Sequence, residues 1–264
     1  MDIQNKLIVI TGASSGIGAA AAEALAAKGG RVVLLARTQA KLEAVAARIK
    51  AEGGQAFVYA VDLGDETAVA HITAAIQQEL GTPDVLINNA GSGQWRAVDE
   101  VTPAEARQMM TLPYHAAYGM TYGFLAAMLQ RNSGHIINMT SVAAYMAIPG
   151  ATAYATARWA MRGFSLGLAA DVNTTQLCVT LLAPSKVSSP YFTNNPGSEE
   201  RIPKIDKIYP TLTPEQVAKK IVKIITQEKC GEIVIPLSVR LTIAFKRLFA
   251  WPVNTLLLRT GWKR

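Results

Sequence analysis

The chain has 264 residues, half of them hydrophobic, which suits one large α/β domain or two small ones with a substantial core. Two cysteines, Cys178 and Cys230, give neither a disulfide framework nor metal-ligand spacing, so the sequence favours a reducing compartment and no bound metal. No uncharged apolar run reaches the ~18 residues of a membrane-spanning helix. Residues 1–6 are polar and leave no room for a leader peptide before the first strand, so we expect a cytoplasmic protein.

The net charge of +7 is unevenly distributed along the chain. Residues 233–264 contain six of the 26 basic side chains and none of the 19 acidic ones, so the remaining 232 residues are nearly neutral. A basic segment on a near-neutral body predicts a local anionic partner rather than a generally charged surface.

The first strand–turn–helix unit dominates the pattern. Four apolar residues, 7–10, are typical of a strand buried on both faces, and an Ala-rich helix follows and ends near Gly29. Between them lies Thr-Gly-Ala-Ser-Ser-Gly-Ile-Gly at residues 11–18. Glycines there let the backbone turn tightly and let a phosphate approach the helix N-terminus. The pattern indicates a nucleotide-binding turn, and its alternative is a tight turn with no ligand.

Strand and helix signals then alternate as far as residue 236. Strands are expected at residues 31–36, 56–61, 84–87, 134–140, 177–182 and 232–235, and helices at 40–52, 66–80, 154–168 and after the capping boxes at 102–105 and 213–216. Such βα repeats predict an α/β fold, a doubly wound parallel sheet of about seven strands with helices on both faces, in a single domain of residues 1–238. Residues 184–212 interrupt the alternation with five prolines, so we predict a flexible substrate lid at 185–212.

Four motifs resemble the short-chain dehydrogenase/reductase family over residues 5–236. They are the glycine turn at 11–18, Asp62, Asn-Asn-Ala-Gly at 88–91, and Ser141 with Tyr154, separated by twelve residues. The resemblance implies a Rossmann fold that binds NAD(P). It also implies that Tyr154 exchanges a proton with the substrate oxygen while the nicotinamide carries the hydride, and that Ser141 hydrogen-bonds that oxygen. Taken alone, these two residues would fit a buried tyrosine and a helix-capping serine.

Two positions depart from the family pattern. Arg158 stands where the family has lysine, one helical turn after Tyr154; its fixed charge can stabilise a phenolate and bind ribose hydroxyls, but it releases no proton. The family's catalytic asparagine, counted back from Ser141 without gaps, falls on Tyr114. Tyr114 and His115 are therefore candidates to hold a water or, as we prefer, to line the substrate pocket.

The residue at the end of the second expected strand, 31–36, indicates whether NAD or NADP is preferred. An acidic residue there would bind the ribose diol of NAD, but the sequence has Arg37, which can pair with a 2′-phosphate, so NADP is favoured over NAD. Arg37 could instead be a solvated residue at a helix start. The predicted cofactor-binding residues are Gly12, Ser14, Ser15, Gly16, Ile17, Gly18, Arg37, Thr38, Asp62, Leu63, Asn89, Ala90, Gly91, Tyr154, Arg158, Pro184, Val187 and Ser189.

Residues 239–264 form a basic extension. On a helix from Val239, an apolar face containing Leu241, Ala244, Phe245, Leu248 and Phe249 would lie opposite Arg240 and Arg247. This pattern favours peripheral contact with an anionic membrane, and nearly as well a helix packed on the domain or on a second subunit. Nucleic acid is a third option, but no binding motif supports it.

Two functions remain open at this point. The first is an NADP-dependent enzyme that interconverts a carbonyl and an alcohol on an apolar small molecule, with Trp95, Tyr191 and Phe192 also in its pocket. The second is an NADP-binding sensor or scaffold of the same fold with little turnover, which the changes at Arg158 and Tyr114 favour. The resemblance implies a homodimer or homotetramer in either case.

Overall fold

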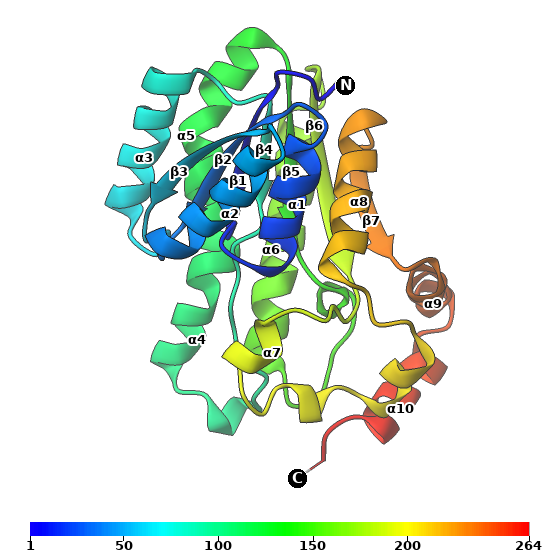
Figure 1. Cartoon of the computed structure of the whole chain (residues 1–264). Helices are drawn as coiled ribbons and strands as arrows, with labels where there is room; N and C mark the ends of the chain where they lie inside the picture. Colours follow the sequence, from blue (N-terminus) through cyan, green and yellow to red (C-terminus); the bar gives the residue numbers. More distant parts are fainter. Residues whose placement is uncertain (264) are drawn as a thin grey trace.

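The computed structural model describes residues 1–263; Arg264, the end of the predicted basic extension, lies outside the described residues. Its centre is a parallel sheet in the order β3-β2-β1-β4-β5-β6-β7, which confirms the doubly wound Rossmann architecture (Figure 1). The strands are β1 (Leu7–Thr11), β2 (Arg31–Ala36), β3 (Gln55–Ala60), β4 (Val85–Asn88), β5 (Gly134–Met139), β6 (Leu177–Pro184) and β7 (Gly231–Ile235). The strand order reverses between β1 and β4, and open sheets of this kind bind ligands beyond the carboxyl ends of the strands at such a point.

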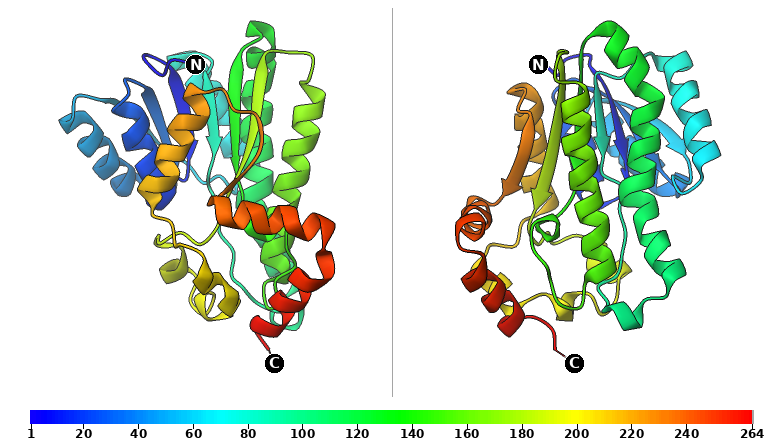
Figure 2. Two further views of the ribbon diagram at one scale, coloured as in Figure 1. Left: turned by 90° about the vertical axis from the view of Figure 1, so that its right-hand side faces the viewer. Right: turned by 180° about the vertical axis from the view of Figure 1, so that it is seen from behind.

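Helices cover both faces of the sheet (Figures 1 and 2). One apolar core joins the sheet to α1 (Gly16–Ala26), α2 (Gln39–Ala51) and α8 (Pro214–Thr226). A second core joins it to α3 (Glu66–Leu80), α5 (Ala116–Arg131) and α6 (Thr152–Asp171). Both expected capping boxes are present, at the starts of α4 (Pro103–Met110) and α8. The sequence therefore fixes where these helices begin through side chains that satisfy their first N–H groups.

The long helix expected after residue 102 is interrupted. Between α4 and α5 the chain makes one π-helical turn, Thr111–His115, with Pro113 buried at its centre. Proline has no N–H to donate, and its ring clashes with the carbonyl four residues earlier, so a regular α-helix cannot continue through it. The turn widens the helix and changes the direction of every side chain after it relative to α4.

The irregular stretch at 185–212 contains α7 (Tyr191–Asn194) and two 3₁₀ turns, Glu199–Arg201 and Lys204–Ile208. After β7 come α9 (Leu237–Leu248) and α10 (Ala250–Thr260), which lie beside this stretch at the same end of the molecule (Figure 2). The expected apolar face of residues 239–249 lies exposed at Leu241, Phe245, Leu248 and Phe249, whereas Val239 and Ile243 form a separate buried stripe of α9 that the sequence analysis did not identify. In residues 1–263 no helix has both the length and the apolarity needed to cross a bilayer.

The two cysteines also differ from expectation. Cys178, on β6, and Cys230, just before β7, are joined by a disulfide between neighbouring strands, with 5.3 Å between their Cα atoms. Their separation of 52 residues hid this pairing, because only the parallel sheet brings the two positions together. The sequence-based preference for a reducing compartment therefore loses its basis.

One histidine is fully buried in the central strand β5. The Nε2 atom of His135 lies 2.7 Å from the hydroxyl oxygen of Thr180, and that hydroxyl donates to the carbonyl oxygen of Lys229 at 2.5 Å. Nε2 must therefore donate, which leaves Nδ1 as a buried acceptor without a partner in the described chain. Burial lowers the pKa of His135 to about 4, so the ring is neutral in the folded protein above that pH.

We predict that His135 makes the fold sensitive to acid. Between pH 6.5 and 4 the unfolded chain binds a proton at this residue that the folded chain does not, so stability falls as pH falls. The expected loss is about 2 kcal/mol of unfolding free energy between pH 7 and pH 5, measured by urea denaturation. His135→Gln should remove that pH dependence, whereas the exposed His71→Gln should preserve it; equal slopes in both variants would contradict the assignment.

Candidate functional site

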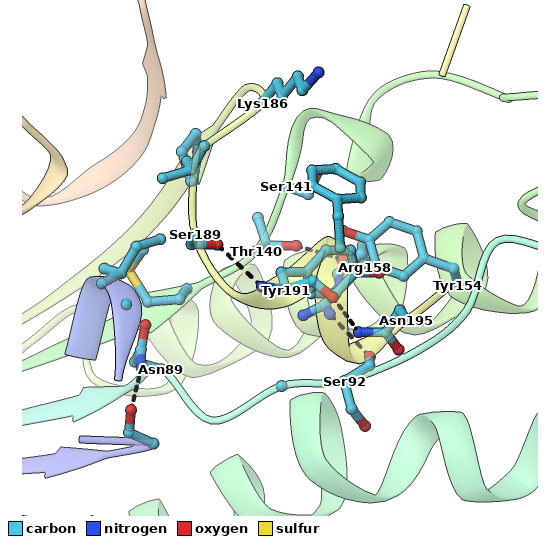
Figure 3. A pocket seen from close by; sticks show the side chains of 18 of the residues that line it. Asn89, Ser92, Thr140, Ser141, Tyr154, Arg158, Lys186, Ser189, Tyr191 and Asn195 are labelled. Carbon is cyan, nitrogen blue, oxygen red and sulfur yellow. Dashed lines mark hydrogen bonds between the residues drawn. The ribbon is translucent and has the colours of Figure 1, made fainter. Parts of the chain in front are cut away.

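A single cavity of about 720 Å³ runs along the carboxyl ends of the strands and on to the lid and the C-terminal helices. Its wall includes the residues that directly follow β1, β2, β4, β5 and β6, namely Gly12, Arg37, Asn89, Thr140 and Ser185. Figure 3 shows side chains that follow β4 and β5, from α6 and from the lid converging on one space. The cavity therefore lies where the sheet topology predicts a ligand.

The glycine turn is held in place by a small set of hydrogen bonds. The hydroxyl of Thr11 accepts the backbone N–H groups of Asn89 and Ala90, both at 2.9 Å, and the Asn89 amide donates back to the carbonyl oxygen of Thr11 at 3.0 Å. Gly16 has φ +54°, which favours glycine, and a Cβ on Gly18 would lie 2.2 Å from the carbonyl oxygen of Gly12. This close approach leaves the N-terminus of α1 open towards the cavity as a site for an anion.

Ser141 and Tyr154 both line the cavity, together with Arg158 one turn further along α6 (Figure 3). The Ser141 hydroxyl oxygen accepts the N–H of Ala143 at 3.3 Å, so its own proton is available to a ligand. The guanidinium carbon of Arg158 lies 4.7 Å from the centre of the Tyr154 ring, a cation–π distance. The predicted trio is thus assembled, with the cation stacked on the phenol ring.

Besides the buried indole N–H of Trp95, two polar groups in the wall lack hydrogen-bond partners in the described chain. Arg158 donates from Nη2 to the carbonyl oxygen of Ser92 at 3.1 Å, but its buried Nε has no partner in the described chain. The same is true of the buried hydroxyl of Ser185, which follows β6. Because buried polar groups are nearly always hydrogen-bonded, two such groups in one cavity point to a polar ligand there, as a nucleotide is.

A second tyrosine faces Tyr154 across the cavity. The rings of Tyr154 and Tyr191 are 6.0 Å apart, and the Tyr191 hydroxyl donates to the carbonyl oxygen of Gly93. Burial, with Tyr154 nearby, raises the pKa of Tyr191 well above its ordinary value, so it stays protonated at neutral pH. Tyr191 therefore fixes the lid to the loop after β4 and is unsuited to proton transfer.

Two basic side chains line the cavity at the carboxyl end of β2. Arg37 and Thr38 line the cavity after β2, as predicted, and Lys41 joins them from the first turn of α2. Both cations are exposed, and neither forms an ion pair with any of residues 1–263. The sequence analysis missed Lys41, although its spacing of four residues from Arg37 places both on one side of a helix start.

The structure brings most of the predicted site residues together but not all. In the cavity wall it places Gly12, Ser14, Ser15, Gly16, Ile17, Arg37, Thr38, Leu63, Asn89, Ala90, Gly91, Trp95, Ser141, Tyr154, Arg158, Pro184, Val187, Ser189, Tyr191 and Phe192. Gly18 lies behind the turn, and the exposed Asp62 accepts the N–H of Gly64 at 2.9 Å.

Tyr114 and His115 were predicted to line the pocket, and this placement is wrong. Both lie outside the cavity wall, where the Tyr114 ring packs edge-on against Phe164 at 6.1 Å and beside His115 at 4.9 Å. From the π turn, Leu112 reaches the cavity instead. The ungapped count gives only a position along the chain, and the wider turn around Pro113 directs these two side chains away from the cavity.

Comparison with known proteins agrees with this geometry. The short chain dehydrogenase family matches residues 6–200. A fatty acyl-CoA reductase of Acinetobacter baylyi is 35% identical over 223 residues, which cover 84% of this chain and 73% of that protein. An uncharacterised oxidoreductase of Mycobacterium tuberculosis is 35% identical over 221 residues, 82% of this chain and 62% of that protein.

Solved structures show the same relationship. A metagenomic short-chain oxidoreductase in complex with NADP superposes with a TM-score of 0.76 at 31% identity, covering 89% of this chain and 98% of the other. Fold and site thus define a dinucleotide-binding oxidoreductase. The chain belongs to the short-chain dehydrogenase/reductase family.

We predict that Gly18→Ala damages both the fold and the nucleotide site. The added methyl group would meet the Gly12 carbonyl, so α1 must move away from the turn, at a cost of about 1–3 kcal/mol of unfolding free energy. The control is Gly163→Ala on α6, where no atom lies within 4 Å of the new methyl group. The control should keep or slightly raise stability. Urea denaturation and NADPH fluorescence titration measure both effects, and equal behaviour of the two variants would show that the close packing is unimportant.

Proposed function

We propose that this protein is an NADP-dependent reductase or dehydrogenase that interconverts a carbonyl and an alcohol on an apolar small molecule. The observation that carries the proposal is the convergence of Ser141, Tyr154 and Arg158 on one cavity, beside the open N-terminus of α1. A hydroxyl donor, a phenol and a fixed cation are what a carbonyl needs if its oxygen is to gain a proton as its carbon gains a hydride.

Each residue has one task in this chemistry. Tyr154 donates its phenolic proton to the substrate oxygen during reduction and takes it back during oxidation, while Ser141 donates a hydrogen bond to the same oxygen. A nicotinamide cofactor, when bound in this cavity, would supply or accept the hydride. The arginine charge stacked on the Tyr154 ring favours the phenolate that is left after proton transfer. Because a guanidinium does not release its proton, renewal of the Tyr154 proton must come from another donor, such as water.

The preference for an apolar substrate is supported by the other end of the cavity. Beyond Tyr154 the wall is mostly apolar and aromatic, with Asp206 as a polar member, and its side chains come from the loops after β4 and β5, the lid, α9 and α10. The apolar and aromatic residues are Trp95, Met146, Ile148, Ile202, Ile205, Tyr209, Val239 and Leu257. Apolar surface of this kind gains free energy by burying a hydrocarbon group. The fatty acyl-CoA reductase relative is named for a substrate with such a group.

NADP is supported over NAD by charge. Arg37 and Lys41 can both reach a 2′-phosphate through charge-assisted hydrogen bonds, and no carboxylate stands at the end of β2 to bind a ribose diol instead. The related metagenomic oxidoreductase was solved with NADP.

Partners and location remain proposals. The outer faces of α5 and α6 carry exposed aromatic and aliphatic side chains, Tyr118, Tyr122, Trp159 and Leu166, which is the kind of surface that subunits bury. This supports a homodimer or homotetramer. A cytoplasmic location and peripheral contact of residues 239–264 with an anionic membrane also stay predictions.

We predict that Arg37→Ala weakens binding of NADPH and leaves binding of NADH unchanged. Loss of one charge-assisted hydrogen bond costs about 1.5–3 kcal/mol, or roughly 10- to 100-fold in the dissociation constant. Arg107→Ala is the control, because it removes the same charge from an exposed position on α4 outside the cavity wall. Equal affinities of the wild type for the two cofactors, measured by fluorescence titration, would refute NADP preference.

We predict that Tyr154→Phe lowers reduction of apolar aldehydes at least about 100-fold, because it removes the proton donor but keeps the ring that stacks on Arg158. Arg158→Lys restores a releasable proton and should maintain or raise turnover. Tyr118→Phe, an exposed position outside the cavity wall, serves as the control. NADPH oxidation measures all four proteins.

Two outcomes would contradict this proposal. Turnover that survives Tyr154→Phe would mean that another group supplies the proton. Tight NADPH binding without turnover by the wild type or the variants on any tested carbonyl would favour the sensor or scaffold function instead.

A further inference from the structure

The two C-terminal helices and the turn between them expose several large apolar side chains to solvent. We call this set the outer face; it consists of Leu241, Phe245, Leu248, Phe249, Trp251 and Leu258. Leu248 is 79% and Trp251 78% exposed, and the rings of Phe245 and Phe249 contact each other at 4.9 Å. Figure 2 shows α9 and α10 at the edge of the molecule, with the sheet on one side only. A patch of this size on a monomer marks an interaction surface.

The opposite side of the same helices belongs to the substrate cavity. Val239 on α9 and Leu257 on α10 are buried and line the cavity, in the same apolar cluster as Tyr154. The wall between the outer face and the catalytic space is therefore one helix thick. Whatever covers the outer face lies next to the apolar end of the cavity.

Charge identifies what covers it. No acidic residue follows Glu232, whereas Arg240, Arg247, Arg259 and Lys263 are exposed on the same C-terminal segment as the outer face. Glu232 pairs with Arg162 at 2.5 Å and with Arg247 at 3.5 Å, whereas Arg240, Arg259 and Lys263 have no ion pair within residues 1–263, so these three leave the segment positive. Exposed leucine, phenylalanine and tryptophan among unopposed cations match the headgroup boundary of an anionic bilayer. A second copy of this face would instead bring like charges together.

The seam between the lid and the C-terminal helices is closed by side chains alone. The Tyr209 hydroxyl lies 2.8 Å from that of Thr242, and the Arg201 guanidinium stacks on Trp262 at 4.5 Å. Within residues 1–263 no backbone hydrogen bond joins the lid to α9 or α10. The seam can therefore open without loss of secondary structure, and the lid residues beside it, Ile202 and Ile205, line the cavity.

We infer that the outer face docks on an anionic bilayer, and that a substrate with a long hydrocarbon chain passes from the bilayer into the cavity through this seam. This deepens the proposed function and rests on it for the chemistry at Tyr154. The carbonyl end reaches Tyr154, while the chain lies against Val239, Leu257 and the apolar side of the lid. Docking then places the entrance where such a substrate is concentrated, because long-chain aldehydes partition into lipid.

The test compares two substrates on phosphatidylglycerol vesicles. The wild type is expected to bind these vesicles in a flotation assay, more weakly at high salt and on phosphatidylcholine alone, and to reduce hexadecanal carried in them. Leu248→Glu combined with Trp251→Glu should lower vesicle binding and hexadecanal turnover about tenfold or more, because membrane binding scales with buried apolar area. Reduction of butanal, which is soluble, should stay within about twofold for this variant, since neither position lines the cavity. Val98→Glu, 68% exposed and far from α9 in sequence, is the matched control and should change none of these rates.

Uptake of a long-chain ligand that is not turned over distinguishes the membrane entry route from the proposed carbonyl chemistry. Transfer of the fluorescent long-chain cis-parinaric acid from vesicles into the protein should be faster for the wild type than for the double variant. If neither protein reduces butanal but this difference persists, the entry route stands and the proposed reaction fails. The entry route is wrong if both proteins reduce butanal and the double variant matches the wild type in two measurements. These are the uptake of cis-parinaric acid and the turnover of vesicle-borne hexadecanal. Failure of the wild type to bind vesicles would also overturn the entry route. If Leu248→Glu converts a dimer to a monomer, the outer face is instead an interface with a second copy of the chain.

Discussion

The hydroxyl of Thr11 is the contact on which the site depends. It accepts two backbone N–H groups from the start of the loop after β4 and donates to the carbonyl oxygen of Ile87, so one side chain joins the ends of the two central strands. The two strands pair through their backbones, and the strand order of the sheet reverses at this point, so the Thr11 hydroxyl and the Asn89 amide hold the two loops that leave β1 and β4 at the edge of the cavity. These contacts fix where α1 starts and how the loop after β4 runs. In that loop the carbonyl oxygen of Ser92 accepts a hydrogen bond from Arg158, and Arg158 in turn stacks on the Tyr154 ring.

Most of the fold could be predicted because its strands and most of its helices have local signals in the sequence. Buried strands are short apolar runs, and the capping boxes before α4 and α8 mark helix starts to the residue. What failed were features that depend on distant partners or on one irregular turn. The Cys178–Cys230 bond exists only because β6 and β7 are neighbours. The buried stripe of α9, Val239 and Ile243, was missed because the neighbouring elements decide which side of the helix is covered.

The site also contains some residues that the sequence predicts and others that it does not. Glycines, Asn89, Ser141 and Tyr154 follow fixed spacings from strands and were predictable from the sequence, as was their meeting at one edge of the sheet. Tyr114 and His115 were misplaced because Pro113 changes the helical repeat between α4 and Ser141. A buried chain of hydrogen bonds was missed altogether: the Asn88 amide donates to Asn138 at 2.8 Å, which donates to Ser165 of α6 at 2.9 Å. No spacing links these three, yet together they hold α6, and hence Tyr154, at a fixed height against the sheet.

The position of β7 has a consequence for how the chain behaves before it is fully folded. As the last strand of the sheet it presents one free edge, and free edges are where chains add to one another and aggregate. Here that edge is short. Cys230, tied to β6, precedes a strand of five residues, and Pro236, which has no N–H, follows it directly. The strand is therefore a poor template for pairing with a neighbouring chain.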